Sequence, residues 1–125
     1  MRLTLLLLVI AACNESGSGG PPDGATGGLF CESGDHVFPV LDKSCTTASD
    51  CFIARHQVSC CGTLIAVGLN TSSQSVFETT EAACAADFPA CGCASEPTAA
   101  EDGRSEVDGA IQVRCIAEQC LTFVP

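Results

Sequence analysis

Hydrophobic and polar positions divide the chain into an apolar start, a polar stretch and a mixed remainder. Residues 3–10, LTLLLLVI, are apolar except for one threonine. Eight positions are too few for a helix that crosses a bilayer, which needs about 20 residues, but they fit the apolar core of an export signal. Residues 14–28, NESGSGGPPDGATGG, contain no large apolar side chain. Because such a stretch cannot bury enough surface to offset the entropy of ordering it, we expect a flexible tether.

Four short segments of the remainder predict β-strands. Residues 52–58, FIARHQV, alternate in part, and residues 64–69, LIAVGL, form an apolar run of strand length that polar residues then end. Near the end of the chain, residues 111–115 alternate between apolar and polar side chains, and residues 120–124 follow after a turn. This last pair is the clearest predicted hairpin.

One helix is predicted between these strands. Ser75 and Glu78 fit a capping box, which predicts a helix from there to about Ala86. Its inward face would carry apolar residues at spacings of seven and four, namely Phe77, Cys84 and Phe88. The expected fold class is therefore α+β: a small disulfide-rich domain with an antiparallel sheet and one helix.

Cysteine content changes the expected source of stability. The chain has eleven cysteines, ten of them within residues 31–125, where only 21 positions are Val, Ile, Leu or Phe. A core this small is marginal, whereas each native disulfide typically contributes about 2–4 kcal/mol. We therefore expect a domain held together by five disulfides, folded in an oxidising compartment. The spacings leave the connectivity open.

The end of the apolar start resembles a known processing site. Ile10-Ala11-Ala12-Cys13 resembles the lipobox of bacterial lipoproteins, an aliphatic residue and two small residues before a cysteine. The resemblance implies cleavage before Cys13 and attachment of lipid to its thiol. It divides the chain into a signal peptide at 1–12, a lipidated cysteine and tether at 13–30, and the disulfide-rich domain at 31–125. An ordinary secretory signal cut near residues 16–20 is the alternative.

The cysteine count and the residue after the lipobox extend this interpretation. An odd number of cysteines in an exported protein leaves one thiol to explain, and a lipid on Cys13 accounts for it. The lipobox, tether and C…DC…CC pattern together resemble the cysteine-rich, mostly uncharacterised lipoproteins of Gram-negative bacteria. Asn14 is not the aspartate that retains lipoproteins at the inner membrane in the best-known sorting scheme, so this resemblance implies the outer membrane.

Charge limits the possible partners. The chain carries five basic and fifteen acidic residues, a net charge of −10, which becomes −11 once Arg2 is removed with the signal. Phosphate-rich partners would be repelled, so nucleic-acid binding is not expected. The membrane, reached through the lipid anchor, is the partner that the sequence predicts, and any protein partner is left unspecified.

Two cysteine motifs are candidates for metal or redox chemistry. Cys60-Cys61 and Cys91-Gly92-Cys93, with His56 nearby, offer soft ligands for Zn²⁺ or Cu(I). Adjacent cysteines chelate one ion poorly, and the thioredoxin-type C-x-x-C is absent from the sequence. We therefore favour structural disulfides at these positions and predict no metal or cofactor. His36 and His56 are interpreted as polar surface residues.

Two further segments suggest recognition loops. Residues 44–51, SCTTASDC, followed by SCCGT at 59–63, are similar to whey-acidic-protein-type inhibitor domains, which implies a protease-inhibitor-like activity. Residues 94–109, ASEPTAAEDGRSEVDG, are predicted to form a solvated acidic loop. Calcium binding by this loop is a weaker alternative, because Arg104 occupies a position where an EF-hand needs an oxygen ligand. As a recognition loop, it would present Arg104.

The sequence favours a non-enzymatic function. Nucleophilic catalysis needs a base and an orienting group beside the nucleophile, and no G-x-S-x-G or related motif is present in the sequence. We predict no catalytic residues and assign Cys13 as the lipid attachment site. The expected function is an extracytoplasmic lipoprotein with a disulfide-stapled interaction module. A protease-inhibitor-like domain is the first alternative, and a thiol-based metal or redox protein is the second.

Overall fold

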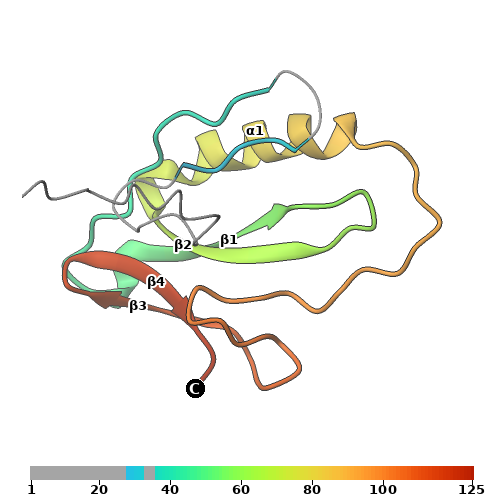
Figure 1. Cartoon of the computed structure of the whole chain (residues 1–125). Helices are drawn as coiled ribbons and strands as arrows, with labels where there is room; N and C mark the ends of the chain where they lie inside the picture. The colour runs from blue at the N-terminus through green and yellow to red at the C-terminus, as the bar shows by residue number, and fades with distance from the viewer. Residues whose placement is uncertain (1–27, 33–35) are drawn as a thin grey trace, which may run out of the picture.

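A computed structural model describes residues 28–32 and 36–125 of the chain (Figure 1). Cys13, the signal segment and nearly all of the tether lie outside the described residues. The described part contains one helix, four strands and five disulfides, which confirms the α+β disulfide-rich fold class. In chain order the elements are β1 (Cys51–Gln57), β2 (Leu64–Asn70), α1 (Gln74–Asp87), β3 (Gln112–Ile116) and β4 (Gln119–Phe123).

The strands form two antiparallel hairpins. β1 pairs with β2 from Cys51↔Asn70 to Gln57↔Leu64, and β3 pairs with β4 from Gln112↔Phe123 to Ile116↔Gln119. The structure therefore has two two-stranded sheets where the sequence predicted one antiparallel sheet. Figure 1 shows α1 along one side of the β1–β2 hairpin and the β3–β4 hairpin on the other.

The turn between β3 and β4 forms without glycine. Ala117 and Glu118 have φ values of 48° and 61°, so both central residues are in the left-handed region. A two-residue hairpin turn of this kind matches the right-handed twist of the strands, although Asn and Gly are the usual occupants. The Glu118 carbonyl also accepts a hydrogen bond from the Cys45 N–H at 3.1 Å, which helps to fix the turn.

The helix begins earlier than its sequence predicted. α1 starts at Gln74 with Ser73 as N-cap, not at the predicted Ser75. The Ser73 hydroxyl accepts a hydrogen bond from the Asp42 N–H at 2.9 Å, so a tertiary contact fixes this end of the helix. Phe77 and Cys84 are buried as predicted, whereas Phe88 lies just beyond the helix and is half-buried.

The core lies between α1 and the β1–β2 hairpin. Phe38 and Phe77 stack with ring centroids 5.8 Å apart, and Phe52 meets Phe77 edge-on at 6.2 Å. The buried residues of this cluster are Phe38, Leu41, Ala54, Val67, Leu69, Phe77 and Cys84. The small number of large side chains in this core is consistent with a domain that depends on its disulfides for stability. Within the described part of the chain, no helix has the length and apolar character needed to span a bilayer.

Candidate functional site

The four cysteines of the two motifs considered for metal or redox chemistry, Cys60-Cys61 and Cys91-Gly92-Cys93, form two neighbouring disulfides at the exposed end of the β1–β2 hairpin. Cys60 is joined to Cys91 and Cys61 to Cys93. We call these two bridges the outer pair. The sulfur atoms of Cys60, Cys91 and Cys93 lie within 4.8 Å of one another, and Cys91 and Cys93 are exposed.

In this state the outer pair is structural. A disulfide sulfur is not the thiolate that a soft metal ion requires as a ligand. The two bridges instead attach the irregular segment after α1 to the turn between β1 and β2. The disulfides favoured from the sequence are therefore the arrangement that the structure contains.

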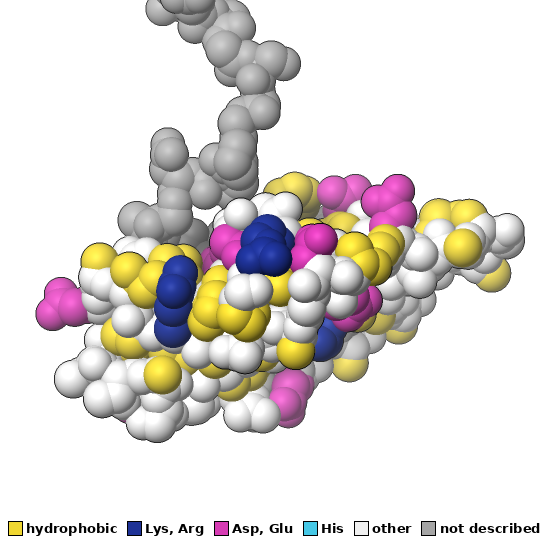
Figure 2. Space-filling model, turned by 90° about the horizontal axis from the view of Figure 1, so that it is seen from below, with side chains coloured by type: hydrophobic (Ala, Val, Ile, Leu, Met, Phe, Trp, Pro, Cys, Tyr) yellow, Lys and Arg dark blue, Asp and Glu magenta, His cyan; other side chains and the backbone are white. Residues whose placement is uncertain are grey.

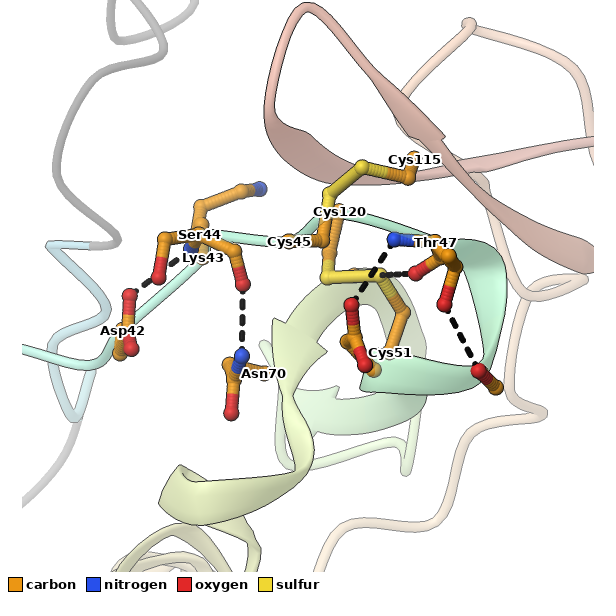
Figure 3. Close-up of a disulfide and its surroundings, with 12 residues drawn as sticks. Asp42, Lys43, Ser44, Cys45, Thr47, Cys51, Asn70, Cys115 and Cys120 are labelled. Atoms are coloured by element: carbon orange, nitrogen blue, oxygen red, sulfur yellow. Dashed lines mark hydrogen bonds between the residues drawn. A yellow bond between two sulfur atoms is a disulfide. The ribbon is translucent and has the colours of Figure 1, made fainter.

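A second group of cysteines lies at the other end of the same hairpin. Cys45 is joined to Cys115, and Cys51 to Cys120. We call these bridges the inner pair. Figure 3 shows the two bridges side by side, and the sulfur atoms of Cys45, Cys51 and Cys120 lie within 4.8 Å of one another. The inner pair joins the start of β1 to the β3–β4 hairpin, so it connects the two sheets.

The carboxylate of Glu101 forms a bridge between β2 and β4. Its Oε2 accepts hydrogen bonds from the Gly68 N–H at 2.9 Å and the Thr122 N–H at 2.8 Å. Its Oε1 pairs with the Nζ of Lys43, a side chain that is only 9% exposed. Glu101 therefore supplies the hydrogen bonds that a further strand would otherwise provide. Buried edge N–H groups need such partners, because leaving them unpaired is costly.

Gly68 allows the two sheets to approach this closely. A Cβ atom at this position would lie 2.6 Å from the carbonyl carbon of Cys120, nearer than any real Cβ contact. The Cys120 N–H also donates to the Lys43 carbonyl at 2.7 Å. We call Lys43, Gly68, Glu101, Cys120 and Thr122 the junction. Sequence analysis placed Glu101 in a solvated loop and assigned it no role, since its partners lie 21 to 58 residues away.

Two acidic side chains of the predicted solvated loop, residues 94–109, bind backbone N–H groups of the protein itself. Asp102 accepts hydrogen bonds from the N–H groups of Val124 and Arg104, and these lower its pKa below the ordinary value. Glu106 accepts from the Thr98 N–H at 3.0 Å, and this bond is the main cause of its lowered pKa. These carboxylates stabilise a folded loop and do not converge on a shared cation site.

The loop is less irregular than the sequence predicted. Ala99 pairs with the edge of β2, because its carbonyl accepts from the Ala66 N–H at 2.8 Å. Arg104, the residue expected to be presented to a partner, directs its Nη1 to the carbonyls of Val124 at 2.7 Å and Pro125 at 3.1 Å. Arg104 therefore secures the loop to the end of β4.

Among the described residues, the exposed arginines do not form a continuous basic patch. Arg55 pairs with Glu106 at 3.6 Å, and the guanidinium of Arg114 lies 4.1 Å from the centre of the Phe123 ring. Figure 2 shows the face below the β3–β4 hairpin, where dark blue basic side chains are separated by acidic and hydrophobic ones.

The two histidines have different environments, and the interpretation of both as surface residues is wrong for one of them. His36 is exposed and lies 3.4 Å from the Asp87 carboxylate at the end of α1. His56 is only 3% exposed. Its Nδ1 lies 2.7 Å from Glu81 Oε2, and its Nε2 lies 3.2 Å from the Phe30 carbonyl. His56 thus ties α1 and the segment around Phe30 to β1.

Three of the most exposed large hydrophobic residues gather in the first part of the described chain. Val40 is 82% exposed, Val37 is 79% and Phe30 is 64%. Phe30 and Val37 face each other in an isolated antiparallel bridge. We call Phe30 and Val37 the apolar lip. No sequence pattern predicts this lip, because single apolar residues in a polar stretch look alike whether they are buried or exposed.

One open hollow lies where this segment meets the β3–β4 turn. It has a volume of about 350 Å³ and is lined by residues 40–44 together with Glu118 and Gln119. Two of its polar side chains, those of Asp42 and Lys43, have partners within the protein. Asp42 accepts a hydrogen bond from the Ser44 N–H at 2.8 Å (Figure 3), and this bond lowers the pKa of Asp42. Lys43 pairs with Glu101.

No protein-family model, curated protein or solved structure matches the chain.

Proposed function

We propose that the chain is a lipid-anchored, extracytoplasmic interaction module with Cys13 as its attachment site. The observation that carries this proposal is the pairing of the ten cysteines from Cys31 to Cys120 into five disulfides. The chain has eleven cysteines, so the one outside this set is Cys13, the cysteine of the lipobox. Five disulfides also require an oxidising compartment, which fits an exported protein.

A binding role is favoured over catalysis by the use of the polar groups. Both ring nitrogens of His56 are in hydrogen-bond contact, Nδ1 with the Glu81 carboxylate and Nε2 with the Phe30 carbonyl, and His36 pairs with Asp87. Among the acids, Asp102 and Glu106 hold backbone N–H groups of their own loop. A general base needs a free position beside a nucleophile. We therefore propose a non-enzymatic module, placed at the outer membrane because Asn14 follows the lipidated cysteine.

The test is the intact mass of protein extracted from membranes, alkylated with and without prior reduction. We expect a chain that starts at Cys13 and carries acyl mass. Ten thiols should react after reduction and none before it. A chain without lipid, or one that starts elsewhere, would refute the anchor. Thiols that react without reduction would favour the metal or redox alternative instead.

A Cys13→Ser variant provides the matched control. It should lose the acyl mass and leave the membrane fraction, while it keeps the same ten thiols that react only after reduction. Loss of those disulfides in the variant would mean that Cys13 takes part in the disulfide framework, which contradicts the proposal.

A further inference from the structure

The outward direction of the apolar lip follows from its local geometry. In the bridge between Phe30 and Val37, these two side chains lie on one face and their neighbours on the other. Cys31 and Phe38, the next residue in each segment, face inward: Cys31 is bonded to Cys84 of α1, and Phe38 is only 6% exposed.

The lip is also held firmly in place. The Cys31–Cys84 disulfide, the hydrogen-bond contact between His56 and the Phe30 carbonyl, and the stacking of Phe38 on Phe77 attach both of its segments to the core. A loose segment could fold its apolar side chains against the protein. Here the covalent and buried contacts keep Phe30 and Val37 in solvent, which marks the lip as a surface for a partner.

The length of the tether limits what that partner can be. Fourteen residues, 14–27, separate the proposed lipid site from Gly28, where the described structure starts. At about 3.4 Å per residue, they reach at most about 50 Å when fully extended. Gly28 lies only two residues before Phe30. The lip is therefore the exposed apolar surface nearest, along the chain, to the anchored end.

We propose that the apolar lip rests on the bilayer and inserts Phe30 and Val37 at the boundary between headgroups and acyl chains. Apolar side chains at this depth add to the binding of a lipid-anchored protein. The net charge of −10 disfavours anionic lipids, so we assign the lip to a surface of zwitterionic headgroups. This inference rests on the proposed lipid anchor.

The absence of tryptophan and tyrosine from the sequence permits a clean test. The full-length lipidated protein carrying Phe30→Trp is placed in phosphatidylcholine vesicles with brominated or ordinary acyl chains. The matched control is Val107→Trp, at a position that is 74% exposed in the loop beside β3–β4. We expect brominated lipid to quench about half of the fluorescence of the Phe30→Trp variant and to leave the Val107→Trp variant unchanged.

Each outcome separates the inference from the proposed function. Intact mass first establishes whether lipid is attached, and its absence would defeat both. With lipid attached, failure of quenching at position 30, or equal quenching at both positions, would overturn the inference alone. A blue shift at position 30 in ordinary vesicles without quenching in brominated ones would mean that a second copy covers the lip. Val37→Trp provides a second reporter if Phe30→Trp fails to form its disulfides.

Discussion

The inner and outer pairs contain the same chemistry in opposite surroundings. In each pair, sulfur atoms from two disulfides come within 4.8 Å of one another. The inner pair spans 70 and 69 residues of sequence and the outer pair 31 and 32. Cys120 of the inner pair is fully buried, whereas Cys91 and Cys93 of the outer pair are exposed.

This difference separates two contributions that a disulfide can make. The two bridges of a pair close almost the same loop of the chain. When one bridge is removed, the other still constrains that loop, so the unfolded chain gains little conformational entropy. What distinguishes the pairs is packing. The inner pair lies against the junction, where β2 and β4 approach closely, whereas the outer pair holds an exposed segment. We therefore expect packing, more than loop length, to rank the effects of losing each bridge.

The largest effect should come from Glu101→Gln. The amide keeps an acceptor for the Gly68 and Thr122 N–H groups but leaves the buried ammonium of Lys43 without its counter-charge. Breaking a buried ion pair from one side is strongly destabilising, and we expect a loss of about 3 kcal/mol in the free energy of unfolding.

Urea denaturation measures this loss, and Glu96→Gln in the exposed segment beside the outer pair is the control. The free energy of unfolding of the control should lie within about 0.5 kcal/mol of that of the unsubstituted protein. Equal effects of the two substitutions would mean that the Glu101–Lys43 pair does not stabilise the contact between the sheets.

The next largest effect should follow removal of one inner bridge. Cys51→Ala combined with Cys120→Ala leaves the Cys45–Cys115 bridge closed and creates a cavity at the fully buried Cys120 position. Because the surrounding structure relaxes only partly, we expect a loss of about 2 kcal/mol. Calorimetry should find a decrease in Tm of roughly 8–16 °C, since 1 kcal/mol corresponds to about 4–8 °C in a domain of this size.

Removal of one outer bridge tests the comparison directly. Cys61→Ala combined with Cys93→Ala leaves Cys60–Cys91 in place and removes mostly exposed atoms. We expect a loss below about 1 kcal/mol under the same calorimetric conditions. If the free energy of unfolding fell as much as in the inner double variant, loop closure, and not packing, would determine how much each bridge stabilises the domain.

The sequence predicted those parts of the fold that depend on local pattern. The strands around LIAVGL and the terminal hairpin follow from short-range alternation and were confirmed. The helix start was displaced by two residues, because Ser73 is held by the N–H of Asp42 from 31 positions away. The disulfide connectivity could not be predicted, since ten cysteines permit many pairings and their spacings do not select among them.

Long-range polar contacts explain what was missed at the candidate sites. His56 was interpreted as a surface residue, but Glu81 and Phe30, which contact its ring, lie 25 and 26 positions away. Glu101 stands in a stretch of small and acidic residues that is typical of solvated loops. Its role depends on the approach of β2 to β4, which no local pattern encodes. Cys13 lies outside the described residues, so its lipid attachment stays a prediction.

The smallest effect concerns the loop that joins the two regions, and it should appear in acid. Hydrogen bonds from the Val124 and Arg104 N–H groups lower the pKa of Asp102 in the folded protein. The stabilisation is present above the unfolded-state pKa of about 3.9 and is lost as the pH falls through the lower folded-state value. We expect Asp102→Asn to reduce the decline in stability below about pH 4.

Asp50→Asn separates this loop from the segment beside the inner pair. Hydrogen bonds from the N–H groups of Thr47, the larger contribution, and Thr46 lower the pKa of Asp50. This variant should therefore also reduce the decline in the free energy of unfolding at acid pH. Only Asp102→Asn, however, should speed amide hydrogen exchange at Val124, whose N–H donates to the Asp102 carboxylate at 2.9 Å. Faster exchange at Val124 in both variants would mean that the loop and the inner pair open as one unit. The junction would then stabilise a larger part of the domain than its own contacts indicate.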